Sequence, residues 1–242
     1  MIVLFTDFGA DDIYVAQLKA ALLQHLSPGR VILDLLHSVP RYRVRAGAHL
    51  LAALQARFPP EAVFVAVVDP GVGTSRDAVV VRADDKWYVG PDNGLLSVVS
   101  ARANKSNTWR IVWHPQGMSA SFHGRDLFAP VAALIAEGSL PADKLQETDA
   151  LDVQLGREDL REVIYIDSFG NALTGLRAAS VSHAATIAVR GHRIAYGRVF
   201  AEASEGGTFW YENSIGLVEI AVNRASAAER LGIDIGDAVI VA

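Results

Sequence analysis

The chain has 242 residues, of which 51% are hydrophobic and 20% charged, and its 22 basic and 27 acidic side chains leave a net charge of −5. This is the composition of a globular protein, and the mild acidity argues against nucleic-acid binding, which usually needs a basic surface. The absence of cysteine excludes disulfides, zinc–thiolate sites, iron–sulfur clusters and cysteine nucleophiles.

The first half of the chain alternates short β-branched runs with helical patterns. Leu18, Leu22 and Leu26 follow Tyr14 at a spacing of four residues, which predicts a helix that ends at Ser27. Further helices are expected over 51–58, from about 93, and over 127–136. Apolar runs predict strands at 2–5, 31–36, 62–68, 78–81, 86–89 and 109–112. This alternation predicts an α/β domain with a largely parallel central sheet.

The pattern changes after about residue 150. Short strand candidates punctuated by glycine follow at 163–166, 186–189, 193–195, 217–222 and 238–241, with no convincing long helix among them. We therefore predict two domains, an α/β domain over 1–155 and a smaller, mostly-β domain over 156–242.

Polar clusters follow several predicted strands directly. Ligands of open α/β sheets bind beyond the carboxyl ends of the strands, so these clusters mark the expected site. The first begins at Thr6, where Asp7 is placed to accept hydrogen bonds from a ligand such as a ribose diol. Asp11 and Asp12 are more simply explained as caps of the following helix.

The second cluster follows the predicted central strand and contains Asp69, Gly71, Gly73 and Arg76. Its two glycines let the backbone approach a ligand closely. Asp69 and Arg76 are close enough in sequence to meet across this loop, either as part of a site or as a purely structural ion pair. The spacing does not match a phosphate-binding P-loop.

The third cluster contains Phe122, His123, Gly124, Arg125 and Asp126 and lies just ahead of a predicted helix. An unperturbed imidazole titrates near pH 6.5, so His123 is the best candidate for a general base, although a single histidine is often structural.

The fourth cluster, Asp167 to Asn171, follows the first strand of the second domain and is echoed by Asn213 and Ser214. An asparagine side chain carries a donor and an acceptor that match the edge of an adenine, and Phe169 and Phe209 are placed to stack on a base. Each segment taken alone is also compatible with a simple turn.

Together these segments resemble one family. Thr6 to Gly9, Val68 to Thr74, Pro91 to Gly94, Phe122 to Asp126, Asp167 to Asn171, and Asn213 with Ser214 resemble the blocks of the S-adenosyl-L-methionine (SAM) hydroxide adenosyltransferases, or SAM hydrolases, which are relatives of the fluorinases and chlorinases. The blocks occur in the family's order over nearly the whole chain.

The resemblance implies that the C-terminal domain is a β-barrel-like domain. It also implies a homotrimer with active sites between subunits, and hydrolysis of SAM to adenosine and methionine. The water-activating set of the family corresponds to Asp69, Arg76 and His123. The halogenating relatives carry tyrosine at the positions of Asp69 and His123, so the resemblance favours hydroxide as the nucleophile.

The same resemblance suggests how the substrate is bound. Asp7 would bind the ribose, Asp167 and Ser214 the amino-acid end, and Asn171, Phe169 and Phe209 the adenine. The remaining residues expected to bind substrate are Tyr42, Phe122, Gly124, Asn213, Glu219 and Val222. Two departures alter this picture, because Tyr42 stands where the halogenases have a tryptophan and Ile215 where they have an arginine.

This chemistry needs no metal and no cofactor, because a sulfonium leaves as a neutral thioether. The difficulty lies in the nucleophile, since bulk water has a pKa of about 15.7. Asp69 or His123 would take the proton of the water, and Arg76, which cannot act as a base, would hold Asp69 and stabilise hydroxide.

Two alternatives stay open. One is a metal-dependent phosphohydrolase with Asp7, Asp11 and Asp12 as ligands, and the other is a non-catalytic adenosine- or SAM-binding module. No apolar run approaches the roughly 18–20 residues of a membrane span, and the N-terminus lacks the pattern of a signal peptide. We therefore expect a cytoplasmic protein whose partner is SAM, with no nucleic-acid or membrane partner.

Overall fold

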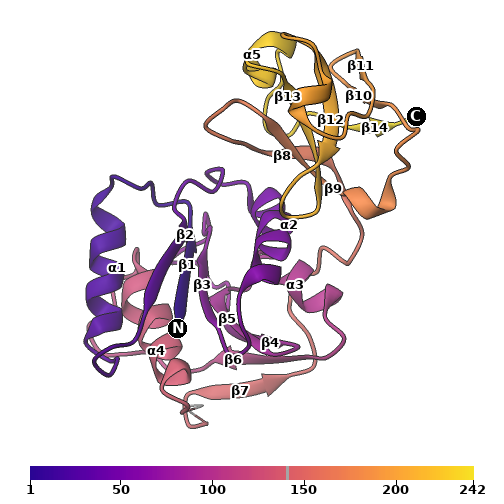
Figure 1. Cartoon of the computed structure of the whole chain (residues 1–242). Helices are drawn as coiled ribbons and strands as arrows, with labels where there is room; N and C mark the ends of the chain where they lie inside the picture. Colours follow the sequence, from indigo (N-terminus) through magenta and orange to yellow (C-terminus); the bar gives the residue numbers. More distant parts are fainter. Residues whose placement is uncertain (140–141) are drawn as a thin grey trace. The chain divides into compact units, whose positions relative to one another are not determined.

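A computed structural model of the protein describes residues 1–139 and 142–242 (Figure 1). The chain divides into two compact units, one formed by Met1–Ala48 with Arg57–Arg157 and the other by His49–Ala56 with Glu158–Ala242. The line between them passes through the helix α2 (Val44–Leu54). The predicted division at residue 155 into two independent domains stays a prediction.

The first unit contains a seven-stranded sheet with helices. Its elements are β1 (Ile2–Thr6), α1 (Ile13–Leu23), β2 (Ile32–Leu36), the start of α2, β3 (Val63–Val67), β4 (Ala78–Ala83), β5 (Lys86–Pro91), α3 (Ser97–Arg102), β6 (Ser106–Ile111), a π-helical turn (Gly124–Phe128), α4 (Ala129–Ala136) and β7 (Leu145–Thr148). These elements confirm the predicted alternation of strands and helices.

The sheet is mixed, with strand order β2-β1-β3-β5-β4-β6-β7. The pairs among β2, β1, β3 and β5 are parallel, so the expected parallel sheet is present on this side. The pairs among β5, β4, β6 and β7 are antiparallel. The cause is local, because only Asp84 and Asp85 separate β4 from β5, and a two-residue turn joins strands only as an antiparallel hairpin.

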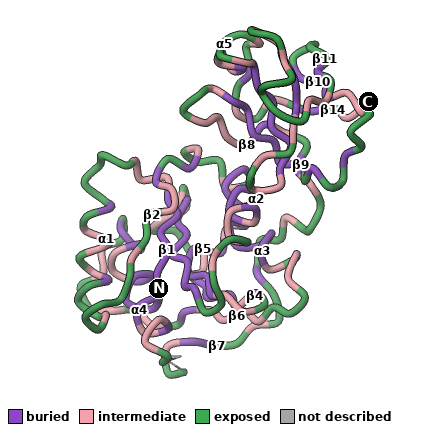
Figure 2. The backbone as a smooth tube through the Cα atoms, viewed as in Figure 1, coloured by how far each residue is buried: buried purple, intermediate pink, exposed green. Residues whose placement is uncertain are grey.

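The strand β3 lies inside the parallel part of the sheet, between β1 and β5. Its side chains contribute to the hydrophobic core of this unit. Its side chains alternate between the two faces of the sheet. Val63, Val65 and Val67 pack into a cluster that also contains side chains of α1 and α4. On the opposite face Phe64 stacks on Tyr88, with ring centroids 5.0 Å apart. The continuous apolar run at 62–68 is therefore explained by burial on both faces of the strand. Figure 2 colours the backbone of the central strands of this sheet as buried.

The helices are placed by their caps and apolar stripes. Asp12 accepts a hydrogen bond from the backbone N–H of Ile13 at 2.7 Å and so caps α1, which buries Leu18 and Leu22. The helix predicted over 127–136 takes α form only from Ala129, since the preceding turn is π-helical. Among the described residues, no helix has both the length and the apolar character to cross a membrane.

The second unit is built on two antiparallel sheets, with orders β12-β13-β9-β8 and β11-β10-β14. Its elements are β8 (Leu160–Ile166), β9 (Ala172–Arg177), β10 (Ile187–Val189), β11 (His192–Ile194), β12 (Thr208–Glu212), β13 (Leu217–Val222), α5 (Ala227–Leu231) and β14 (Ile240–Val241). This confirms the prediction of a mostly-β C-terminal region.

Among the strands and α-helices of the described residues, β7, β9, β12 and α5 were not predicted from the sequence. The strand β7 reads Leu-Gln-Glu-Thr and has no apolar run, so only its pairing with β6 defines it. The strands β9 and β12 and the short helix α5 lie beside turn residues that hide their patterns. In the core of this unit Trp210 on β12 is fully buried and donates its indole N–H to the carbonyl of Ala185 at 3.1 Å.

Substitution of Gly90 on β5 tests the central pairing. A Cβ at this position would lie 2.3 Å from the carbonyl oxygen of Ala66, which is backbone and cannot move aside. Gly90→Ala is therefore expected to lower the free energy of unfolding by about 3 kcal/mol, measured by urea denaturation. Gly117→Ala is the control, since that glycine has φ +79° and open space around it, and it should cost about 1 kcal/mol. Equal losses in the two variants would contradict the close approach of β3 and β5.

Candidate active site

A cavity of about 330 Å³ in the first unit is lined by residues that follow β1 and β3. Asp7 comes directly after β1, and Asp69 lies two residues beyond β3. The segment before the π-helical turn supplies another wall. Of the residues predicted for the site, those that line this cavity are Asp7, Tyr42, Asp69, Phe122, His123 and Gly124.

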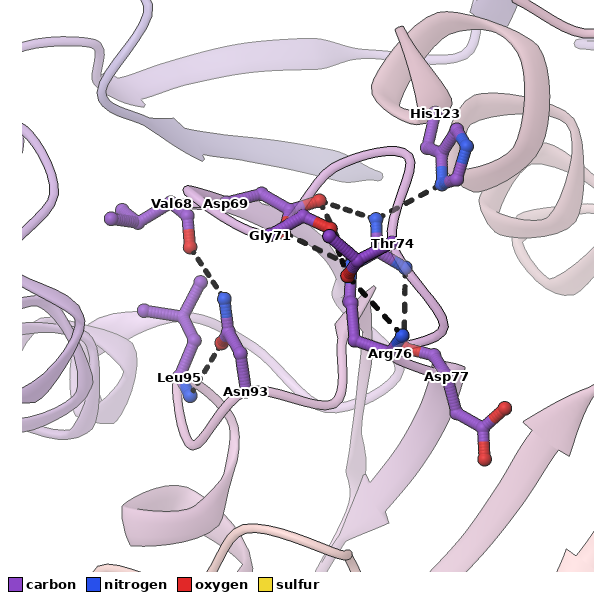
Figure 3. A network of polar contacts seen from close by, with 9 residues as sticks. All are labelled: Val68, Asp69, Gly71, Thr74, Arg76, Asp77, Asn93, Leu95 and His123. Carbon is purple, nitrogen blue, oxygen red and sulfur yellow. Dashed lines mark hydrogen bonds and ion pairs between the residues drawn. The ribbon is translucent and has the colours of Figure 1, made fainter. Parts of the chain in front are cut away.

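Asp69 and Arg76 form a buried ion pair beside this cavity (Figure 3). The Nε–H of Arg76 donates to both carboxylate oxygens of Asp69, at 3.0 and 3.1 Å, and a terminal N–H of the guanidinium donates to Oδ2 as well. The side chains of Arg76 and Asp69 are only 10% and 5% exposed. Burial of two charges is costly, and a fork-like geometry of this kind compensates for it.

His123 joins this pair through the same guanidinium. Arg76 Nη2 lies 3.0 Å from His123 Nδ1. Because arginine can only donate, Nδ1 must accept, and the proton of the neutral imidazole is then on Nε2. Burial lowers the pKa of His123 below its ordinary value of 6.5, and the positive charge of Arg76 lowers it further. The structure therefore brings together the three residues that the sequence predicted for water activation.

The turn Pro91 to Gly94 holds both ends of the loop that carries Asp69 and Arg76. The side-chain N–H of Asn93 donates to the carbonyl of Val68 at 2.8 Å, just before Asp69. The backbone N–H of Asp92 donates to the carbonyl of Asp77 at 2.9 Å, just after Arg76. A guanidinium N–H of Arg76 also donates to the carbonyl of Asp77, at 3.2 Å. The sequence marked this turn as a family block but did not indicate its role.

A cation–π contact with Phe128 also stabilises the guanidinium of Arg76. Arg76 lies over the ring of Phe128, 5.5 Å from its centroid. Phe128 is fully buried and ends the π-helical turn that begins directly after His123. Cation–π contacts of this kind are worth more when the cation is desolvated. The same turn therefore positions His123 and supports Arg76.

A hydrogen-bonded chain fixes the loop that carries Asp7. His37 Nε2 donates to Asp34 Oδ1 at 3.0 Å, so its Nδ1 accepts from the hydroxyl of Thr6 at 2.8 Å. The Thr6 oxygen in turn accepts from the backbone N–H of Phe8 at 3.3 Å. Thr6 is fully buried and therefore inaccessible to a ligand, so the Thr–His–Asp arrangement is structural. The sequence did not single out Asp34 or Thr6 for this role.

The carboxyl group of Asp7 is partly withdrawn from solvent. Burial raises its pKa above the ordinary value, and the backbone N–H of Tyr42, at 3.5 Å, acts in the opposite direction. The neighbouring Asp69 adds to the increase, whereas Arg41 opposes it.

Three aromatic rings form one wall of the same cavity. The centroids of Phe8, Tyr14 and Phe122 are 5.5 to 5.7 Å apart in pairs, and Tyr14 meets Phe122 edge to face. Gly124 also lines the cavity and lies close to this wall. A Cβ on Gly124 would be only 3.2 Å from the ring of Phe8.

The second unit has a cavity of its own, of about 780 Å³. The predicted residues that line it are Asp167, Phe169, Asn171, Asn213, Ser214, Glu219 and Val222. Phe169 is 79% exposed and thus available to a ligand. Phe209 is not among the described lining residues. It is buried and packs against Phe200 and Tyr211, at 5.0 and 5.6 Å between centroids. Phe209 shares one face of β12 with Tyr211, which lines the cavity, but it lies beneath the rings of Tyr211 and Phe200.

The carboxylates of this second cavity are held by hydrogen bonds. Asp167 accepts from the backbone N–H groups of Phe169 and Asn171, at 2.9 and 2.8 Å, and from the Asn171 amide at 3.1 Å. Glu219 accepts from the Tyr211 hydroxyl at 2.5 Å and from the Asn213 amide at 2.8 Å. Burial raises the pKa of Glu219, and these two donors oppose the increase.

Asp7, Asp11 and Asp12 were considered as ligands of a metal. Within residues 1–139 and 142–242, no three histidine or acidic side chains are grouped so that they could hold a metal ion. Asp12 caps α1, as one of the sequence-based interpretations has it.

Comparisons with known proteins agree with this architecture. The chain matches the family described as the SAM hydroxide adenosyltransferase N-terminal domain over residues 2–146 and the corresponding C-terminal domain over residues 161–240. An (R)-S-adenosyl-L-methionine hydrolase of Thermus thermophilus is 39% identical, over 96% of this chain and 95% of that protein. A fluorinase of Actinopolyspora mzabensis is 27% identical, over 94% of this chain and 92% of that protein.

A solved structure resembles the whole chain. The crystal structure of an uncharacterized conserved protein from Thermotoga maritima superimposes with a TM-score of 0.89 and 32% identity, covering 100% of this chain and 99% of that one. The matches to both family domains and the identity to the Thermus hydrolase lead to one conclusion. The chain belongs to the SAM hydroxide adenosyltransferase family.

Proposed function

We propose that this protein hydrolyses SAM to adenosine and L-methionine, with water as the nucleophile. The observation that carries the proposal is the Arg76 guanidinium, which binds Asp69 and His123 at one side of a cavity. Membership of the SAM hydroxide adenosyltransferase family supports it, as do relatives named (R)-S-adenosyl-L-methionine hydrolase.

The reaction is an in-line displacement at C5′ of the ribose. The oxygen of water forms a bond to C5′ as the bond between C5′ and sulfur breaks, and the electron pair of that bond stays on sulfur. Methionine then leaves as a neutral thioether, and the water loses one proton. A nucleophile held in line with the breaking bond avoids the entropic cost of a bimolecular encounter.

The geometry favours Asp69 as the group that takes this proton. With Nδ1 of His123 accepting from Arg76, Nε2 carries a hydrogen and cannot accept another. His123 therefore donates a hydrogen bond to the water and holds it in place. Arg76 neutralises the carboxylate before the reaction and stabilises the negative charge that develops on the oxygen.

Both cavities contribute to substrate binding in this proposal. In the first, Asp7 accepts hydrogen bonds from the ribose hydroxyls, while Tyr42, Phe122 and Gly124 surround the sugar. In the second, the adenine is bound by Asn171 and Phe169. Phe209 supports this cavity by packing against Phe200 and Tyr211, which line it. The others assigned to the second cavity are Asp167, Asn213, Ser214, Glu219 and Val222.

We further propose that the active form is a homotrimer with its active sites between subunits. Each cavity contains only part of the residues that the reaction needs, which supports a site completed by a second subunit. We also propose that the two C-terminal sheets close into a barrel, supported by single β-bridges that join Glu162 to Ala238 and Tyr196 to Trp210.

Incubation of the purified protein with SAM tests the central proposal. Adenosine and methionine should appear in equal amounts, measured by chromatography. Asp69→Asn should lower kcat by about 100-fold or more, because the amide cannot accept the proton. Asp11→Asn is the matched control, since Asp11 is exposed and does not line the cavity, and it should keep full activity.

The same assay decides between the alternatives. No cofactor is required in the proposed reaction, so EDTA should leave the rate unchanged. A rate abolished by EDTA would favour a metal-dependent hydrolase, and tight binding without adenosine release would favour a binding module.

Titration of His123 by NMR tests its contact with Arg76. The midpoint should lie below pH 6.5, because burial and the guanidinium both disfavour the imidazolium. The value of kcat/KM should fall as the pH drops through this midpoint, since the protonated ring cannot accept from Arg76. Arg76→Met should raise the midpoint, whereas Arg110→Met, which removes an arginine paired with Asp77, should not. A wild-type midpoint above 6.5 would show that the hydrogen bond is absent.

Complementation between two inactive variants tests the trimer. Asp69→Asn inactivates the first cavity and Phe169→Asp the second. Because Asp69 is half of a buried ion pair, circular dichroism of each separate variant must first show a folded protein. If each site combines cavities from two subunits, mixed trimers from coexpression should recover about a quarter of the wild-type activity, because one random pairing in four combines two intact halves. Activity no higher than that of the separate variants, or a monomer in light scattering, would exclude the arrangement.

A further inference from the structure

The side chain of Arg41 carries a positive charge at the first cavity. The proposed mechanism does not use this charge. The Arg41 side chain lines the cavity together with Asp7 and Asp12. Arg41 lowers the pKa of Asp7 by its charge. Within the described parts of the chain, no carboxylate forms an ion pair with its guanidinium. A cation that faces a ligand cavity and forms no ion pair of its own is available to an anionic group of the ligand.

The backbone around Arg41 is shaped to bring it to the cavity. In an extended segment, consecutive side chains point to opposite sides. Tyr42 instead has φ +63°, a left-handed conformation that is costly for a residue other than glycine. Its backbone N–H faces the carboxylate of Asp7 at 3.5 Å. This turn allows Arg41 and Tyr42, although consecutive, to line the same cavity.

Asp12 lies beside Arg41 across Gly9. A Cβ atom placed on Gly9 would lie 3.7 Å from Arg41 Nη2 and 4.0 Å from Asp12 Oδ2. The other oxygen of Asp12, Oδ1, accepts from the N–H of Ile13. One positive and one negative side chain thus lie within reach of a single small group. This arrangement suits a zwitterion better than a simple anion.

SAM offers such a zwitterion at its amino-acid end, in the carboxylate and ammonium of its methionine part. A guanidinium is the side chain best matched to a carboxylate, which it can bind through two parallel hydrogen bonds. The position after Ser214 is occupied by Ile215, which has no charge to offer a carboxylate. A cation in another part of the site can take this role.

Resting on the proposed function, we propose that Arg41 binds the carboxylate of the methionine part of SAM and so determines specificity for a substrate with an intact amino-acid end. Arg41 touches a part of the substrate remote from C5′. It therefore contributes to binding equally before and during the reaction, and its loss should act on KM and leave kcat unchanged.

A comparison of two substrates on three proteins tests this assignment. The substrates are SAM and decarboxylated SAM, which lacks only the carboxylate, and the proteins are the wild type, Arg41→Gln and Arg43→Gln. Arg41→Gln should raise KM for SAM by about 10- to 100-fold, the usual range for a lost hydrogen bond between charged groups. Its KM for decarboxylated SAM should change by less than about twofold, and kcat should be preserved.

Arg43→Gln is the matched control, because it removes the same charge two residues away, from an exposed side chain that is not among those lining the cavity. It should leave both substrates unaffected. Arg41→Lys should recover part of the discrimination, since lysine keeps the charge but not the paired hydrogen bonds. Equal losses for both substrates, or no loss for SAM, would overturn the assignment.

Calorimetric titration of the same proteins with the same two ligands separates this inference from the proposed function. If the wild type binds SAM but releases no adenosine, hydrolysis is wrong, and the ratio of the two Kd values still measures the contribution of Arg41. If hydrolysis occurs and that ratio is the same in the wild type and in Arg41→Gln, only the assignment of Arg41 is wrong. If SAM does not bind at all, both are wrong.

Discussion

The chemistry proposed for this protein depends on one guanidinium. Arg76 holds the carboxylate of Asp69 through several hydrogen bonds and donates another to Nδ1 of His123. Because arginine keeps its charge at any physiological pH, it can only donate hydrogen bonds to both neighbours. It fixes the orientation of the carboxylate, and it determines which nitrogen of the imidazole carries hydrogen. A lysine in its place would supply the charge but not this fixed geometry.

The rest of the first unit places this guanidinium. The parallel strands β1 and β3 end side by side, so the residues that follow them meet at one edge of the sheet. The π-helical turn presents His123 at its start and Phe128 at its end, which puts a hydrogen-bond acceptor and an aromatic face on the same guanidinium. The buried chain through Thr6 and His37 holds the loop of Asp7 in the same way.

Much of this could be predicted from the sequence, and the exceptions have identifiable causes. Apolar periodicity located the strands of the parallel part, polar residues after them located Asp7 and Asp69, and the cluster ahead of a predicted helix located His123. The antiparallel placement of β4 follows from a two-residue turn that was not recognised in the sequence, whereas the pairing of β7 depends on β6, which is distant in the chain. The contact between Arg76 and His123, 47 residues apart, is equally non-local. Arg41 was missed because an arginine in a loop has no local pattern that distinguishes it from a solvated side chain.

The turn formed by Asp92 and Asn93 has a consequence for how this fold changes its chemistry. Its two hydrogen bonds reach the backbone at Val68 and Asp77, outside the segment that carries the reactive side chains. The stem of the loop is thus secured by main-chain carbonyls, which every amino acid possesses. Evolution can therefore replace the side chain at position 69 while the backbone that carries it stays in place.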